Sequence, residues 1–374
     1  MAQAEHKEIV WFNAVRGIAA LEVCASHLRS FLFVNFAAVS RPTALGRVFY
    51  FATGLGHEAV VIFFVMSGWL VGGSVWRQQR EDRFSWRDYG TARLTRLWLV
   101  LIPALIWTEA VDHMGISISG GYGYDGSRFV TSSSGPGNDA PLDLSTTAFA
   151  GNAFFLQTIL VPVLGTNGPL WSLAYEFWYY LAFPLLAWAW HRRSSWRGLG
   201  FAAAGAAILI WLPAPIREGF VVWLLGWLGA MLFPRVRSSA AIPLALSSLV
   251  LTIALLVVFK QRPIAGSGIL LGIAVVGLLI GLRLRPNSAA FPWVQAAATH
   301  LAKISYTLYL FHFPLLALCF FSLHLAQRQP ATPAYGEFAI LLCAVLIVAT
   351  GLWHLFERRT ESVRRRVRSL WAPR

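Results

Sequence analysis

Charged residues are scarce in this sequence, and their scarcity decides the solvent in which the chain folds. Only 13% of the residues are charged, whereas 57% are hydrophobic and 14% are aromatic, which is too apolar for a soluble domain of this length. The apolar runs are continuous rather than alternating, which excludes an outer-membrane β-barrel. Several runs approach the roughly 20 residues that a helix needs to cross a hydrocarbon core of about 30 Å. The sequence therefore predicts an all-α, polytopic integral membrane protein.

Cysteine is nearly absent as well. The three cysteines, Cys24, Cys319 and Cys343, fall inside apolar stretches without paired spacing, so neither a disulfide framework nor a metal site is indicated. We interpret them as small core residues. The N-terminus also lacks a basic segment followed by a short apolar core and a cleavage site, so we expect no removable signal peptide and a first helix that stays as an anchor.

Acidic residues are outnumbered by basic ones, 17 against 31. The basic residues lie between and after the apolar runs and form no stripe on a soluble domain, so we expect no nucleic-acid partner. With the N-terminus in the cytoplasm, the inner segments hold 19 Lys and Arg and the outer segments hold seven, the asymmetry of the positive-inside rule. This pattern predicts two cytoplasmic termini, with the basic tail 357–374 touching anionic lipid.

About ten transmembrane spans account for the apolar runs, and they predict a single domain over residues 1–374. The Gly-, Ser-, Asp- and Asn-rich segment 113–147 is predicted to be the sizeable aqueous loop, on the outer side. The apolar segment 148–162 is too short and too Pro-flanked to span, so we expect it to be re-entrant or to lie on the membrane surface. The predicted spans are 12–36, 57–76, 92–112, 170–190, 199–213, 218–234, 240–259, 264–284, 299–325 and 336–356.

The first predicted span carries four ionisable residues, which are costly inside a bilayer and therefore indicate a functional site. At 100° per residue, Arg16 and His27 lie within about 20° of each other, and Glu22 and Arg29 share another stripe roughly 140° away. For Arg16 and His27 we favour a functional role over a structural one. For Glu22 and Arg29 we favour a structural link to neighbouring helices near the outer surface.

Two arginines mark the cytoplasmic start of the third predicted span. Arg93 and Arg96 are one helical turn apart in TARLTR, so their guanidinium groups point the same way. Two such guanidinium groups match a polyanionic ligand better than they match a single carboxylate. The alternative is that both only mark the inner boundary of the membrane.

Glu176 and His312 are the other ionisable residues that stand out inside apolar runs. Glu176 lies about two turns below the predicted outer face, with Ser172, Tyr179 and Tyr180 at neighbouring helical positions. Lone membrane carboxylates seldom lack a partner. His312 follows Tyr309 in the ninth predicted span, and its alternative interpretation is a hydrogen-bonded interior histidine without a catalytic part.

Depth estimates connect these residues. At 1.5 Å per residue, His27 lies about 22 Å above the cytoplasmic start of its helix, Glu176 about 9 Å below the outer start of its own, and His312 about 18 Å above the inside. In a slab of about 30 Å these depths agree. The cytoplasmic third instead holds Arg16, Arg93 and Arg96. The sequence thus predicts a site through the membrane, cationic at its inner mouth and equipped for acid–base chemistry near its outer end.

Five segments, in this order, resemble one known family: RGIAALEVCASH (16–27), FFVMSGWLVGG (63–73), RLTR (93–96), GPLWSLAYEFWYYL (168–181) and ISYTLYLFHFPLL (304–316). Together they resemble the acyltransferase-3 membrane acyltransferases, which modify hydroxyls of extracytoplasmic glycans and related molecules. The resemblance implies a ten-helix bundle that uses cytoplasmic acetyl-CoA or another acyl-CoA. It also implies that the family's essential first-helix positions, its Arg-x-x-Arg pair and its fourth-span acid are occupied here by Arg16, His27, Arg93, Arg96 and Glu176.

Three residues depart from the family pattern. Asn13 stands where many members carry Asp, Phe177 follows Glu176 where a second Glu is common, and Glu22 is an unusual addition to the first helix. These departures leave the class intact and bear on the choice of substrate.

The predicted chemistry follows from this layout. A neutral His27 removes the proton of an acceptor hydroxyl as it attacks the thioester, and an ionised Glu176 orients or stabilises the imidazole. Ser67 or Tyr309 helps to stabilise the oxyanion, and His312 completes the substrate-binding set. The phosphates of acyl-CoA stay at Arg93 and Arg96. Direct transfer needs fewer assumptions than a covalent acyl-enzyme, and no metal is expected.

A transporter is the main alternative. Ionisable residues in a helical bundle also mark transport pathways, so the chain could export an anionic metabolite or a lipid-linked sugar. Against this stands the absence of an inverted repeat and of paired Gly- or Pro-broken helices. A catalytically silent scaffold fits poorly with so many costly charges. We therefore expect an O-acyltransferase of a bacterial inner membrane that acts on a glycan or glycolipid and is surrounded by membrane lipids.

Overall fold

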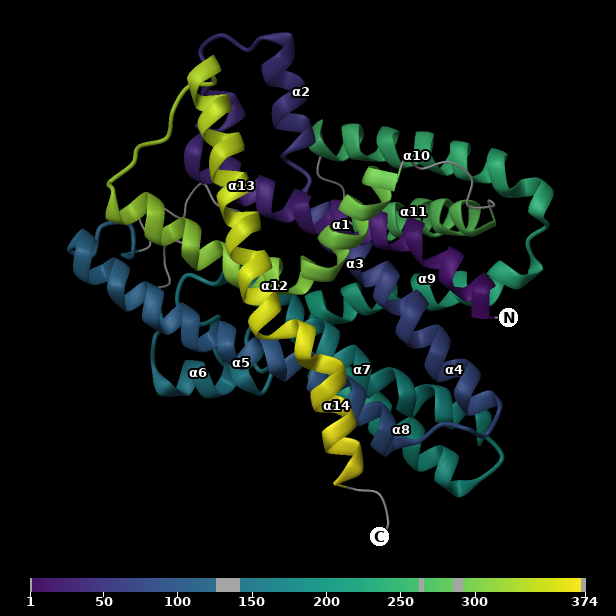
Figure 1. Ribbon diagram of the computed structural model, residues 1–374. Helices are drawn as coiled ribbons and strands as arrows, with labels where there is room; N and C mark the ends of the chain where they lie inside the picture. The colour runs from purple at the N-terminus through teal and green to yellow at the C-terminus, as the bar shows by residue number, and fades with distance from the viewer. Residues whose placement is uncertain (1, 126–141, 262–265, 285–291, 371–374) are drawn as a thin grey trace. The chain divides into compact units, whose positions relative to one another are not determined.

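The computed structural model describes residues 2–125, 142–261, 266–284 and 292–370. Within these ranges the chain is helical and contains two isolated β-bridges but no β-strand, which confirms the all-α prediction (Figure 1). Seven described helical segments are long and apolar enough to cross a membrane. The chain is therefore an integral membrane protein, while the count of ten spans and the orientation of the termini stay predictions.

The helices divide between two compact units, which are described one at a time. The first unit comprises Met1–Ala19, His57–Ser85 and Tyr175–Ala302. The second comprises Ala20–Gly56, Trp86–Ala174 and Lys303–Arg374. Four helices contribute residues to both units, and these are α1 (Ala2–Leu32), α3 (Gly56–Ser67), α7 (Trp171–His191) and α12 (Pro292–Ser322). The prediction of one domain is not decided by this division.

The first unit is held together by a close crossing of two segments. Helix α3 (Gly56–Ser67) continues through a π-helical turn, Gly68–Gly72, into α4 (Gly73–Arg80). A Cβ atom at Gly68 would overlap the carbonyl oxygen of Trp223 on α9 (Ala214–Leu232). Only glycine therefore permits this approach, and the π-helical turn, a feature common at functional sites, begins directly after Ser67.

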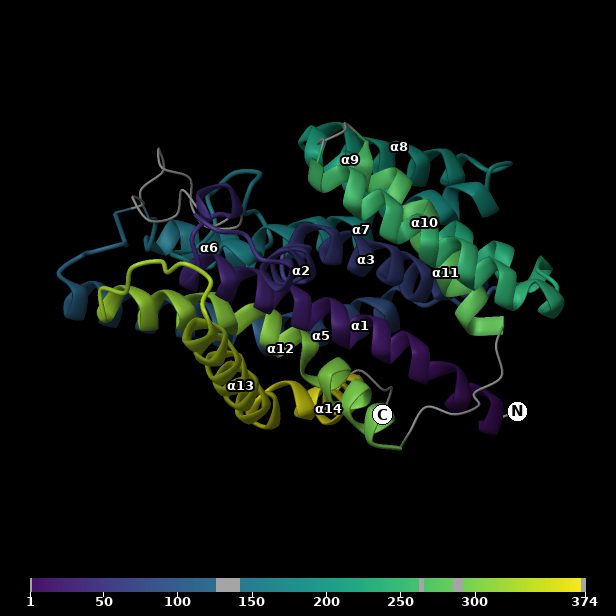
Figure 2. The ribbon, with the colours of Figure 1, turned by 90° about the horizontal axis from the view of Figure 1, so that it is seen from above.

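The rest of the first unit is a set of paired helices. Helices α10 (Ala241–Gln261) and α11 (Ser267–Leu284) lie side by side along their length (Figures 1 and 2). Helix α11 also packs on α9. Helix α8 (Trp196–Trp211) is shorter than the candidate spans.

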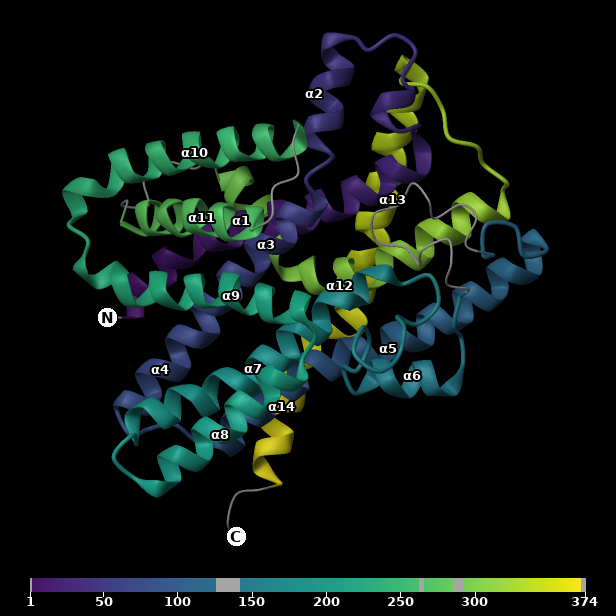
Figure 3. The same cartoon turned by 180° about the vertical axis from the view of Figure 1, so that it is seen from behind.

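The second unit is built on the long helix α5 (Trp86–Ser119). The short helix α6 (Thr146–Ala153) packs along α5 (Figures 1 and 3). At the other end of the chain, α13 (Thr332–Leu355) leads into α14 (Thr360–Ser369), which packs on α5. An ion pair of 3.1 Å between Arg368 and Asp88 joins α14 to α5. The unit also contains α2 (Ala44–Ala52).

Several predicted boundaries are wrong. Helix α5 runs to Ser119 and so includes the first residues of the predicted loop 113–147, where Gly115 and Ser119 are buried against the protein. Helix α1 reaches from Ala2 to Leu32 instead of over 12–36. The central part of the predicted loop, 126–141, lies outside the described residues.

The segment 148–162 does not form a spanning helix. Only its start is helical, as the end of the eight-residue α6, and the residues that follow form turns. The prediction that it is too short to span is confirmed, whereas its place relative to the membrane stays a prediction.

The cysteines are free and differ in burial. Cys24 is buried, Cys319 is partly exposed and Cys343 is exposed. The interpretation as core residues is correct for Cys24 and wrong for Cys343, because an apolar run in a membrane helix has a lipid-facing side as well as a buried one.

Candidate active site

The imidazole rings of His27 on α1 and His312 on α12 form a buried pair in the second unit. Nδ1 of His27 lies 2.8 Å from Nε2 of His312, and the two ring centroids are 5.1 Å apart. His27 is 4% exposed and His312 is 1% exposed. Phe313 packs edge-on against His27. Two residues far apart in the chain thus form a hydrogen-bonded pair in apolar surroundings.

The second bond of His312 decides which nitrogens carry protons. Nδ1 of His312 lies 2.8 Å from the carbonyl oxygen of Leu308, and a carbonyl can only accept, so this nitrogen is the donor. Burial favours neutral rings, and a neutral His312 then has an unprotonated Nε2 that accepts from Nδ1 of His27. His27 therefore keeps its lone pair on Nε2, and this is the atom that can take a proton from a hydroxyl.

Tyr309 lies one turn before His312 on α12. Its hydroxyl is 2.7 Å from the hydroxyl of Ser172 on α7, and Oγ of Ser172 lies 3.4 Å from the carbonyl oxygen of Pro169. Because that carbonyl can only accept, Ser172 donates to it and Tyr309 donates to Ser172. Tyr309 thus has a partner for its proton, and an oxyanion role requires its hydroxyl to turn toward the substrate.

A buried polar network that contacts α5 and α12 was not identified from the sequence. Asp112 on α5 accepts from the backbone nitrogen of Thr166 at 2.7 Å and from its hydroxyl at 2.8 Å. Asn167 donates to Thr108 at 3.0 Å and to the carbonyl oxygen of Leu310 at 2.9 Å. All four side chains are fully buried. These bonds tie the loop before α7 to α5 and α12. The signal available in the sequence is a carboxylate, Asp112, at the end of an apolar run.

Glu176 occupies a polar cluster in the first unit. Its Oε1 accepts from Ser67 at 2.8 Å and from the hydroxyl of Tyr180. Ser67 in turn accepts from the indole Nε1 of Trp223 at 3.1 Å. The proton of Ser67 is therefore directed to Glu176, and the carboxylate has the partners that a membrane acid needs.

The predicted catalytic residues thus fall into two clusters. His27, with His312, belongs to the second unit and Glu176, with Ser67, to the first. The structure brings together His27 with His312 and Ser67 with Glu176, and the sequence predicts neither pairing. The partnership of His27 with Glu176 stays a prediction.

Arg16 binds a helix backbone within the first unit. Its Nη2 donates to the carbonyl oxygen of Ala302 on α12 at 2.5 Å. At the next residue, Gly17, α1 and α12 approach closely, since a Cβ there would lie 2.8 Å from that of Leu301. This contact gives Arg16 a structural role. Its role in donor binding stays a prediction.

Arg93 and Arg96 lie on α5 in the second unit. Arg93 is half-buried and Arg96 is exposed. Helix α14 contributes further arginines to this unit, and the ion pair between Arg368 and Asp88 places α14 against the start of α5. The predicted polyanion site thus lies on α5, and the arginine-rich helix α14 packs against the same helix.

Glu22 and Arg29 link α1 to the connection between α2 and α3. Glu22 accepts from the backbone nitrogen of Leu55 at 2.7 Å, and Nε of Arg29 donates to the carbonyl oxygen of Thr53 at 3.1 Å. The guanidinium of Arg29 also stacks on the ring of Tyr50 at 5.2 Å. The predicted link to neighbouring helices is observed, whereas the position of this pair near the outer surface stays a prediction. Among the described residues, no group of three or more His, Cys, Asp or Glu side chains is placed to hold a metal ion.

Comparison with known proteins gives a consistent result. A family model described as an acyltransferase domain matches residues 9–354, and this confirms the resemblance to the acyltransferase-3 family. The chain is also 26% identical to the protein named acyltransferase MdmB of Streptomyces mycarofaciens over 390 aligned positions, which cover 91% of this chain and 88% of that protein. No solved structure matches the chain.

Proposed function

Because the chain belongs to the acyltransferase-3 family, we propose that it transfers an acyl group, most simply acetyl, from cytoplasmic acyl-CoA to a hydroxyl of an extracytoplasmic or lipid-linked glycan. The observation that supports this proposal best is the hydrogen-bond chain from Leu308 through His312 to His27. It leaves Nε2 of His27 as a proton acceptor, which is what attack by a hydroxyl requires.

The reaction balances without a further reagent. The acceptor hydroxyl gives its proton to Nε2 of His27 as its oxygen forms a bond to the thioester carbonyl carbon. The carbon–sulfur bond then breaks, and the proton passes from His27 to the leaving thiolate of CoA. Throughout, Nδ1–H of His27 donates to His312, so the imidazolium that forms is stabilised by a neutral ring.

His312 acts in this scheme as a positioning residue. Its bond to the Leu308 carbonyl holds one tautomer, and its Nε2 holds the ring of His27. The sequence pattern instead predicts that His312 contacts the substrate. The observed contacts support the positioning role, since both of its ring nitrogens already have partners.

Glu176 and Ser67 are the other predicted residues that the structure pairs, within the first unit. The carboxylate of Glu176 accepts hydrogen bonds from two hydroxyl groups, those of Ser67 and Tyr180. We assign to Glu176 the stabilisation of the imidazolium of His27, an assignment that rests on their similar predicted depth. Ser67 donates to Glu176 in the structure, so an oxyanion role for Ser67 requires rotation of its hydroxyl.

The donor is proposed to bind through its phosphates at Arg93 and Arg96, with Arg16 nearer the thioester. Charge-assisted, bidentate contacts favour arginine for this task. The setting is proposed to be a bacterial inner membrane. Membership of an acyltransferase family favours this function over the transport alternative, as well as over a silent scaffold.

The test is a transfer assay with purified protein in lipid nanodiscs. Acetyl-CoA is supplied with a panel of glycans and glycolipids, and acylated products are detected by mass spectrometry together with CoA release. Product formation that disappears in His27→Gln supports the proposal. Product formation at the wild-type rate in that variant contradicts the catalytic assignment, and the absence of both product and acyl-CoA binding contradicts the function.

A further inference from the structure

The first unit contains a large cavity that the proposed reaction does not use. Its volume is about 1240 Å³, and its wall is formed by residues of the π-helical turn, α4, α7, α9, the turn after α9 and the end of α11. This volume is above the roughly 300–1000 Å³ of typical ligand pockets. We call it the arginine cavity, because four of its lining residues are Arg77, Arg80, Arg235 and Arg283.

The four arginines come from three separate segments, and the lining contains a single carboxylate, that of Glu81, which forms an ion pair with Arg83. Neither Arg77 nor Arg80, both exposed on α4, has an ion-pair partner among the described residues. Arg283 is held in place by stacking, with its guanidinium 4.4 Å from the ring centroid of Phe233. The cavity therefore has an excess of positive charge that its own wall does not neutralise.

Two indole N–H groups strengthen this imbalance. Nε1 of Trp69 and Nε1 of Trp227 are buried and have no hydrogen-bond partner among the described residues. Trp69 is 2% exposed, and both residues line the cavity. Buried donors without acceptors are rare because each forfeits its hydrogen bond to water. The wall thus offers many donors and few acceptors, which is complementary to a ligand rich in acceptor oxygens.

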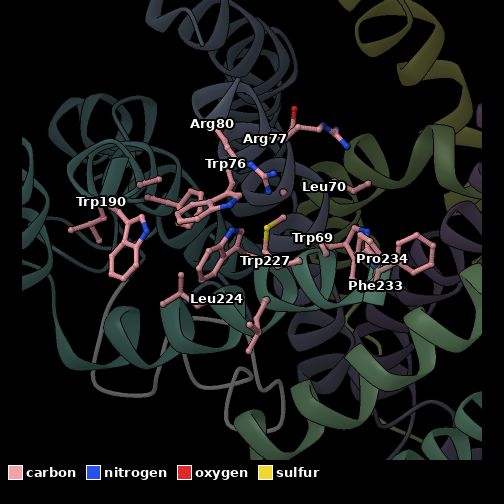
Figure 4. Close-up of a pocket in the computed structure, with 18 of the residues that line it drawn as sticks. Trp69, Leu70, Trp76, Arg77, Arg80, Trp190, Leu224, Trp227, Phe233 and Pro234 are labelled. Carbon is pink, nitrogen blue, oxygen red and sulfur yellow. The ribbon is translucent and has the colours of Figure 1, made fainter. Parts of the chain in front are cut away.

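The remaining wall is aromatic. Figure 4 shows the rings of Trp76, Trp190 and Trp227 grouped at one side of the cavity and Trp69 with Phe233 at the other. Trp76 packs edge-on against Trp227 with centroids 5.0 Å apart, and Trp190 is 60% exposed. Rings of this kind bind flat or apolar groups. A small inorganic ion would leave this surface unused.

We propose that the arginine cavity binds an organic phosphate, that is, a phosphate ester whose remainder is planar or apolar. Guanidinium groups hold phosphate oxygens in bidentate fashion, the two indole N–H groups supply further donors, and the rings cover the remainder of the ligand. The segments that carry Arg77, Arg80 and Arg235 are predicted to be cytoplasmic, so the ligand enters from that side.

Two sources offer this chemistry, a soluble nucleotide and an anionic phospholipid. The soluble source is probed with adenosine 3′,5′-bisphosphate and the lipid source with phosphatidylglycerol. Binding of the bisphosphate is measured by titration calorimetry on the full-length protein in phosphatidylcholine nanodiscs. Retention of phosphatidylglycerol is measured by native mass spectrometry. Neither measurement depends on acyl transfer, so the inference can stand or fall apart from the proposed function.

The decisive variant is Arg77→Gln/Arg80→Gln. Its matched control, Arg197→Gln/Arg237→Gln, removes the same charge from exposed arginines of the same unit that do not line the cavity. We expect the first variant to lose about tenfold to a hundredfold in affinity for whichever probe binds, and the control to stay within about threefold. Bisphosphate binding that is lost in Arg77→Gln/Arg80→Gln and kept in Arg93→Gln/Arg96→Gln identifies the nucleotide source at this cavity. Lipid retention that is lost in Arg77→Gln/Arg80→Gln identifies the lipid source.

A second pair of variants tests the indole donors. Trp69→Phe and Trp227→Phe keep an aromatic ring and remove the N–H group, so each is expected to weaken binding by about threefold to tenfold. The inference is overturned if neither probe binds. It is also overturned if the Arg77→Gln/Arg80→Gln protein, folded by its melting temperature, binds as tightly as its control.

Discussion

Nδ1 of His27 donates a hydrogen bond to Nε2 of His312 at 2.8 Å, and this relationship determines the chemical state of His27. Nδ1 of His312 donates its proton to the Leu308 carbonyl. The ring nitrogen of the two histidines that keeps a free lone pair is therefore Nε2 of His27. Two neutral histidines that are linked in this way act as one base, and its proton-accepting atom is Nε2 of His27.

The first prediction concerns His27 itself. His27→Gln should reduce the transfer rate by about 10²–10⁴-fold, because an amide can form hydrogen bonds but cannot accept the proton. Affinity for acyl-CoA should stay within a few-fold. Rates, affinity and melting temperature are measured together with His27→Ala. A purely structural histidine would behave otherwise: the Ala variant would lose thermal stability, and the Gln variant would recover most of the activity.

The second prediction separates positioning from stability at His312. His312→Ala should lower kcat by about tenfold to a hundredfold with little change in KM, because His27 loses the acceptor that orients it. His312→Gln should recover part of kcat, since its amide oxygen can accept from Nδ1 of His27. The pH profile of kcat should shift in His312→Ala. Equal kcat values for the Ala and Gln variants, with losses only in melting temperature, would assign His312 a structural part alone.

Local periodicity explains which features of α1 could be predicted. The helical spacing places Glu22 and Arg29 on one stripe, and both bind the backbone at Leu55 and Thr53. The partner of His27 is a different case. His312 is 285 residues away, and only a comparison of depths suggests that the two are at the same level. Helix periodicity specifies a face and a height but not which neighbour fills the space beside it.

Other features depend on tertiary packing that no local pattern reveals. The irregular segment before α7 is held by Asp112 and by Asn167, which bonds to α5 and α12. The arginines of the cavity are each explained in sequence by the positive-inside rule. Arg77 and Arg283 are far apart in the chain, so their common cavity becomes visible only in the folded structure.

The third prediction concerns Arg93 and Arg96. The double variant to Gln should weaken acyl-CoA binding and leave the protein folded in detergent, because each lost charge-assisted hydrogen bond is worth about 1.5–3 kcal/mol. Calorimetric titration with CoA, and with a diphosphate fragment that should account for most of the loss, checks this. Unchanged CoA affinity would remove the donor-binding role from this pair, whatever the behaviour of the arginine cavity.

The fourth prediction concerns topology. Single cysteines at Asp125 and at Ser369, both exposed, are introduced after the native cysteines have been replaced by alanine. An impermeant thiol reagent applied to intact cells should modify the cysteine at 125 and spare the one at 369, and both should react after lysis. Modification of position 369 in intact cells, or protection of position 125, would contradict the model with cytoplasmic termini.

The fifth prediction separates the charge of Glu176 from its hydrogen bonds. Glu176→Gln keeps a carbonyl oxygen that can accept from Ser67 and Tyr180, and it removes only the charge. If that charge stabilises the imidazolium of His27, kcat should fall by at least about tenfold, equivalent to roughly 1.4 kcal/mol. Tyr180→Phe provides the matched control, because it removes one hydrogen bond to Glu176 and retains the carboxylate. That variant should lose stability by about 1 kcal/mol but keep kcat within a few-fold. Both variants are compared in kcat and melting temperature. A Glu176→Gln protein with wild-type kcat would leave Glu176 as a structural acceptor for α3 and α7 and would require the imidazolium to be stabilised by His312 alone.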